Sequence, residues 1–104
     1  MHIKKKIMKE NLESKSRNRI LIEELFSSTE DVLFADGYDD CIIGFDEASW
    51  RVVYSKYDVI RQLFISHDEW SESDCIEFAE YNIFGAYVGA KTPIWMEDFN
   101  EVYL

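Results

Sequence analysis

Three aspartates, Asp36, Asp39 and Asp40, cluster around Gly37 and could together hold a cation. An EF-hand calcium loop needs oxygen ligands at alternating positions, glycine at the sixth position and glutamate at the twelfth. Counted from Asp36, glycine stands at the second position, and Glu47 at the twelfth lies beyond a predicted strand. The spacing therefore indicates a polar turn and excludes an EF-hand.

The two cysteines and two histidines give little scope for zinc binding or nucleophilic catalysis. A structural zinc site takes four converging ligands, usually in short paired spacings. Cys41 and Cys75 each stand alone among apolar neighbours, which is typical of inert core thiols. The motifs GxxxxGK[ST], GxGxxG and HExxH are absent. We therefore expect a protein that is not an enzyme, with no catalytic residues, no metal and no cofactor.

The elements that position these side chains form one α+β domain. Apolar residues at helical spacing predict helices, and short β-branched runs predict strands. Ser55 and Ser71 are candidate helix caps, and Asp74 stands three residues after Ser71. The economical fold is a small antiparallel sheet, made of a hairpin and a C-terminal strand, with two to three helices packed on one face. The expected elements are helices over 19–27, 55–67 and 71–85 and strands over 41–45, 51–55 and 92–96.

Two strand residues carry positional information. Gly44, inside the first strand, indicates a bulge or a close approach by a neighbouring chain segment. Pro93, at the beginning of the last strand, fits an edge strand because proline cannot donate a hydrogen bond to a ladder.

The net charge of −10 is distributed unevenly along the 104 residues. Residues 1–19 hold seven basic and two acidic residues, whereas residues 20–104 hold four basic and nineteen acidic residues. We interpret 1–19 as a basic N-terminal arm or an extension of the first helix, and 20–104 as a single acidic domain. Such a body repels nucleic acid and attracts a basic surface. The alternative interpretation is that acidity only keeps the protein in solution.

Two tryptophans, Trp50 and Trp70, fall in predicted loops among acidic residues. Loops usually face water, so exposed tryptophans with an acidic rim would resemble the central residues of a protein interface. Alternatively, each tryptophan folds over the core as a lid. The candidate partner-binding residues are Asp46, Glu47, Trp50, Asp68, Glu69, Trp70, Glu72, Glu77 and Glu80.

Four stretches of the chain resemble a family of small acidic proteins of tailed bacteriophages. They are DGYDDCIIGF at 36–45, RVVYS at 51–55, NIFGAYVG at 82–89 and TPIW at 92–95. The family shares the order DGxD, two strands, a helix, ExxxxNxxGAYVG and TPIW, and the similarity covers about residues 34–98. The resemblance brings no catalytic or binding residues to this chain. It implies a phage product made in the host cytoplasm, where small non-enzymatic proteins commonly redirect or block host machinery.

Together these observations predict a phage accessory protein that binds and inhibits or redirects a host or defence protein with a basic surface. A nucleic-acid-binding component of a CRISPR or restriction system is one such target. We expect no direct binding to nucleic acid and no membrane association, since the longest uncharged run, 81–90, is too short to span a bilayer. The alternatives are a structural or self-associating module, such as a homodimer, and a small-ligand binder built around 36–40 and 85–89.

Overall fold

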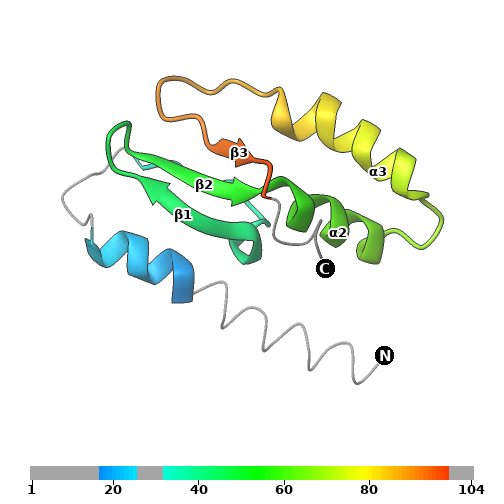
Figure 1. The fold of residues 1–104 in the computed structure, drawn as a ribbon, viewed down its shortest axis with the longest axis horizontal. Helices are drawn as coiled ribbons and strands as arrows, with labels where there is room; N and C mark the ends of the chain where they lie inside the picture. Colours follow the sequence, from blue (N-terminus) through cyan, green and yellow to red (C-terminus); the bar gives the residue numbers. More distant parts are fainter. Residues whose placement is uncertain (1–16, 26–31, 99–104) are drawn as a thin grey trace.

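The computed structural model describes residues 17–25 and 32–98, which form an α+β fold, as the sequence predicts (Figure 1). The predicted basic arm lies outside these ranges, except for residues 17–19, which are helical. None of the helices in the described ranges is long and apolar enough to cross a membrane.

In chain order the elements are a helix over 17–25, the 3₁₀ helix η1 (Asp39–Cys41), β1 (Ile42–Asp46), β2 (Arg51–Ser55), α2 (Lys56–Ser66), α3 (Glu72–Ala79), the π-helical turn η2 (Glu80–Phe84) and β3 (Ile94–Met96).

The predicted hairpin is confirmed: β1 and β2 pair antiparallel, with Phe45 opposite Val52. The register shifts between Ile42 and Gly44, so that Ile43 is an extra residue in β1. This is the bulge that Gly44 indicated. The other explanation, a close approach, does not hold, because no atom lies within 4 Å of where a Cβ would stand at Gly44.

The prediction of an all-antiparallel sheet is wrong for the third strand. β3 pairs parallel to β2, with Val53 opposite Ile94 and Tyr54 opposite Trp95, and β2 lies in the centre of the mixed sheet. A parallel neighbour needs a long crossover connection, and here α2 and α3 together supply it (Figure 1). Pro93 immediately precedes β3, which is an edge strand as predicted.

The core lies between one face of the sheet and the helices. Val52 and Tyr54 alternate along β2 and are both fully buried, together with Ile22 of the first helix. From the crossover, α2 and α3 add Val59, Leu63, Cys75 and Ala79 to the same cluster. Since all three helices contribute to the cluster that holds Val52 and Tyr54, they pack on one face of the sheet, as expected. Burial of each large aliphatic side chain contributes about 1.5–3 kcal/mol.

Both predicted serine caps are confirmed. The Ser55 hydroxyl accepts a hydrogen bond from the backbone N–H of Asp58 at 3.0 Å. Ser71 forms a reciprocal capping box, in which its hydroxyl accepts from the Asp74 N–H at 3.1 Å and the Asp74 carboxylate accepts from the Ser71 N–H at 3.0 Å. These bonds satisfy N–H groups that have no partner inside a helix.

The turn η2 changes which side chains reach the core. A π-helical turn contains one residue more than an α-helical turn and rotates the residues that follow it. Ile83 and Phe84 therefore pack against the core cluster, and the Phe84 ring lies 5.4 Å from the Trp95 ring. Asn82 and Ala86, in contrast, are exposed.

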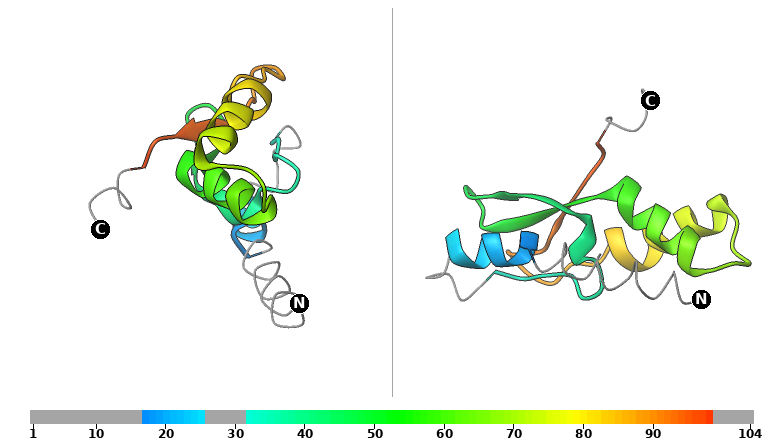
Figure 2. Two further views of the ribbon diagram at one scale, coloured as in Figure 1. Left: turned by 90° about the vertical axis from the view of Figure 1, so that its right-hand side faces the viewer. Right: turned by 90° about the horizontal axis from the view of Figure 1, so that it is seen from below.

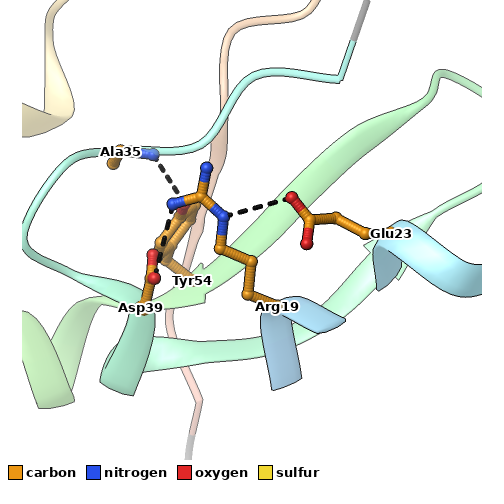
Figure 3. A network of polar contacts seen from close by, with 5 residues as sticks. All are labelled: Arg19, Glu23, Ala35, Asp39 and Tyr54. Atoms are coloured by element: carbon orange, nitrogen blue, oxygen red, sulfur yellow. Dashed lines mark hydrogen bonds and ion pairs between the residues drawn. The ribbon is translucent and has the colours of Figure 1, made fainter. Parts of the chain in front are cut away.

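A polar network ties the first helix to the sheet (Figure 3). Arg19 forms ion pairs with Glu23 at 3.5 Å and with Asp39 of η1 at 3.4 Å. Beneath this guanidinium, the hydroxyl of fully buried Tyr54 accepts a hydrogen bond from the Ala35 N–H at 2.6 Å. Burial raises the pKa of Tyr54 to about 12. The network thus joins the first helix, the segment before β1 and the central strand.

We expect Tyr54→Phe to destabilise the fold at neutral pH, because the Ala35 N–H then loses its acceptor, at a cost of about 1–3 kcal/mol. The raised pKa adds a pH dependence. The stabilisation of the folded state that comes from the raised Tyr54 pKa is fully present below about pH 10, the usual tyrosine pKa. Between about pH 10 and pH 12 the free energy of unfolding falls by about 1.4 kcal/mol per pH unit, and this stabilisation is lost. Urea unfolding of both proteins from neutral to alkaline pH measures this. A difference between wild type and variant that stays constant above pH 10 would contradict the assignment.

Candidate functional site

The nine predicted partner-binding residues do not form one surface. Three of them lie in the β1–β2 turn, and the other six lie in the α2–α3 loop and along α3 to the start of η2. Figures 1 and 2 show the β1–β2 turn and the α2–α3 loop at opposite ends of the molecule. The hairpin-end group is Asp46, Glu47 and Trp50, and the crossover-end group is Asp68, Glu69, Trp70, Glu72, Glu77 and Glu80.

The hairpin end combines acidic and basic side chains. The Asp46 carboxylate accepts hydrogen bonds from the Ser49 hydroxyl at 2.6 Å and the Ala48 N–H at 3.3 Å, so it serves the turn. Lys91 donates to the Ser49 carbonyl at 3.3 Å, and Arg51 stands opposite Asp46 in the strand ladder. Because cations accompany the carboxylates, this end is a weak candidate for an acidic interface.

Trp50 is part of the hairpin and is half-buried. Its ring meets Phe45 edge-on, with ring centroids 6.1 Å apart. Its φ of 59° lies in the left-handed region, where a bulky residue is uncommon and strained by about 1 kcal/mol or more. The arrangement agrees with the lid interpretation of this tryptophan more than with a freely projecting side chain.

The crossover end carries a concentrated negative charge. Asp68, Glu69, Glu72, Glu77 and Glu80, here called the acidic face, are all exposed, and none forms an ion pair with another described residue. Residues 62–90 contain six acids and not one lysine or arginine. Exposed like charges along one loop and helix repel one another, so this face gains energy when a cationic surface approaches it.

Trp70 gives the acidic face a rigid base. Its ring stacks on His67 at 3.8 Å, lies 5.1 Å from the Phe78 ring, and packs against the core cluster while remaining half-buried. A ring nitrogen of His67 lies 3.0 Å from the Leu63 carbonyl oxygen at the end of α2. Trp70 therefore covers part of the core, in agreement with the lid interpretation. It also fixes the loop that contains Asp68 and Glu69.

The sequence patterns missed exposed apolar side chains beside these carboxylates. The helical spacing of Ile76 to Ala79 favours the buried side of α3, yet the Ile76 side chain is 41% exposed. Tyr81 is 81% exposed at the start of the uncharged run, and Phe64 and Ile65 are exposed at the end of α2. The presence of aromatic residues near acids was visible in the sequence, but their exposure depends on the packing of α2 against α3.

The cysteines and carboxylates offer no assembled reaction centre within the described residues. Burial, together with the charges of Asp74 and Glu72, raises the pKa of the Cys75 thiol, which keeps it protonated. No three His, Cys, Asp or Glu side chains of residues 17–25 and 32–98 gather so that they could hold a metal ion. What the acidic face offers chemically is charge and apolar contact.

Comparisons of the chain with protein-family models, with curated proteins and with solved structures find no match. Function is therefore inferred from the acidic face and from the residues that support it.

The capping box fixes the beginning of α3, which carries part of the acidic face, and should therefore stabilise the folded protein. We expect Ser71→Ala to lower the free energy of unfolding by about 1 kcal/mol. The matched control is Ser73→Ala, which removes an exposed hydroxyl from the first turn of the same helix and should change stability by less than about 0.5 kcal/mol. Urea unfolding followed by tryptophan fluorescence measures both, and equal effects would refute the role of the cap.

Proposed function

We propose that this chain is a non-enzymatic binding protein that inhibits or redirects a host or defence protein by covering a basic surface with its acidic face. The observation that carries the proposal is the set of five exposed carboxylates, on a loop and helix without lysine or arginine, that form no ion pair with any other residue of 17–25 and 32–98. Basic surfaces of this kind commonly serve to hold nucleic acid, so carboxylates would stand in for phosphates.

The apolar side chains around the acidic face favour a protein partner. Interfaces bury a central aromatic or aliphatic group inside a polar rim, and the rim mainly sets the rate and specificity of association. Ile76 stands between Glu72 and Glu77 along α3, Tyr81 directly follows Glu80, and both side chains are exposed, so they provide such a centre. A purely solubilising surface would gain nothing from exposed apolar groups at these positions.

The resemblance to small phage proteins supports the choice of partner. A protein made in the cytoplasm of an infected bacterium meets host enzymes and defence complexes there, and many of these bind nucleic acid through basic surfaces. One-to-one binding that blocks such a surface requires no catalytic residues in the inhibitor.

The decisive test compares two triple charge reversals with the same net charge. The first replaces Glu69, Glu77 and Glu80 of the acidic face with lysine. The matched control replaces three exposed carboxylates elsewhere with lysine, namely Glu24, Asp36 and Glu97. Each variant is immobilised and exposed to a bacterial lysate, and retained proteins are identified by mass spectrometry and compared with those that the wild-type chain retains.

We expect the control triple to retain the same partner as the wild type and the acidic-face triple to lose it, because reversal replaces attraction to a cationic surface by repulsion. Circular dichroism confirms that both variants are folded. Loss of the partner from both triples would show that only net charge matters, and loss from neither would exclude the acidic face as the interface.

A further inference from the structure

A cleft of about 440 Å³ lies between the start of β3 and the loop that follows η2. None of the carboxylates in the described part of the chain lines it, although the protein has 21 acidic residues. Its charged lining residues are both cations, Arg51 at the start of β2 and Lys56 at the start of α2. The lining residues are Arg51, Lys56, Phe84, Gly85, Ala86, Tyr87, Thr92, Pro93, Ile94 and Trp95.

The two cations are positioned by contacts that leave most of their donors unused. Arg51 donates through Nε to the Thr92 carbonyl at 2.5 Å, which uses one of the five N–H donors of a guanidinium. The Lys56 ammonium lies 5.1 Å from the centre of the Phe84 ring, a cation–π contact. Neither cation forms an ion pair with a described carboxylate.

The loop that forms one wall is fixed by its own hydrogen bonds. The Thr92 hydroxyl accepts from the Val88 N–H at 2.9 Å and donates to the Gly89 carbonyl at 2.6 Å. Gly89 has a φ of 111°, which strains any residue with a side chain. On this fixed loop the Tyr87 side chain is 80% exposed. An aromatic ring held in water beside two cations is suited to stack on a planar group of a ligand.

We propose that this cleft binds a nucleoside phosphate, with Arg51 and Lys56 facing the phosphates and the aromatic side chains facing the base. The volume lies in the range of small-molecule sites. Arg51 and Lys56 are five residues apart at the two ends of an extended strand, roughly 17 Å between Cα atoms. Their long side chains can therefore meet the two phosphates of a nucleoside diphosphate, whereas a single phosphate would meet only one of them. A long nucleic acid is disfavoured, because the rest of the chain is strongly negative.

Isothermal titration of the full chain with ADP, in a buffer without divalent cations, tests this proposal. The fragments adenosine and inorganic pyrophosphate serve as separate probes of the base and phosphate parts. We expect ADP to bind at least about tenfold more tightly than either fragment, because one molecule then uses both sets of contacts. Lys56→Gln and Tyr87→Ala should each weaken ADP binding by about fivefold or more, whereas Arg61→Gln, which removes an exposed cation from α2 outside the cleft, should leave it unchanged.

Three results would overturn the proposal. The first is no detectable binding of ADP at millimolar concentration. The second is ADP binding that Lys56→Gln and Tyr87→Ala leave intact, since the ligand would then lie elsewhere. The third is pyrophosphate binding as tight as ADP binding, which would mean that the aromatic residues contact no base. Arg51→Gln is a secondary variant, because Arg51 also holds Thr92. The test is independent of the acidic face and of its partner.

Discussion

Tyr54 is the side chain on which the arrangement of the described elements depends most. It is fully buried in the central strand, its ring lies 4.8 Å from Trp95 of β3, and its hydroxyl accepts the Ala35 N–H. Directly above it, Arg19 joins the first helix to η1 through Asp39 (Figure 3). A buried hydroxyl needs such a partner, and a ring of this size fills the space between sheet and helices. The sheet, the first helix and the segment between them are therefore held in one relative position.

This arrangement separates the charges of the molecule. The α2–α3 loop, α3 and the start of η2 carry six acids, while Arg51 begins β2, Lys56 begins α2 and Lys91 lies in the loop before β3. The result is an acidic face at one end and a cleft with two cations and no carboxylates beside β3. A protein with acidic residues spread evenly over its surface would have a similar electrostatic potential in both regions. This separation is the basis for proposing a cationic partner for the acidic face and an anionic ligand for the cleft.

The sequence predicts features that depend on neighbouring residues. The capping box of Ser71, the cap of Ser55 and the bulge at Gly44 each follow from local hydrogen bonding or backbone geometry, and all three are confirmed. The direction of β3 could not be predicted in this way, because it depends on how α2 and α3 together span the sheet. A single strand of three residues carries no pattern that distinguishes a parallel from an antiparallel neighbour.

The candidate site was predictable only in part for the same reason. The high number of acidic residues along 68–80 was visible in the sequence. The separation in space between the β1–β2 turn, with Asp46 and Glu47, and the acidic face was not. Trp70 is half-buried because it stacks on His67, a contact between loop residues that no periodicity reveals. The sequence offered 85–89, together with 36–40, as the basis of a small-ligand site, and residues 85–87 line the cleft beside β3. It did not reveal that Arg51 and Lys56 line the same cleft, because this depends on the pairing of β3 with β2.

The central claim is that the acidic face binds its partner through charge, and the dependence of affinity on salt tests it most directly. Screening shortens the reach of exposed charges from about 10 Å at 0.1 M salt to about 3 Å at 1 M salt. For the partner retained from lysate and then purified, the account predicts that the dissociation constant rises by about tenfold or more across this range. A dissociation constant that is unchanged, or that falls as salt is added, would mean that apolar contact alone holds the complex and would contradict the account.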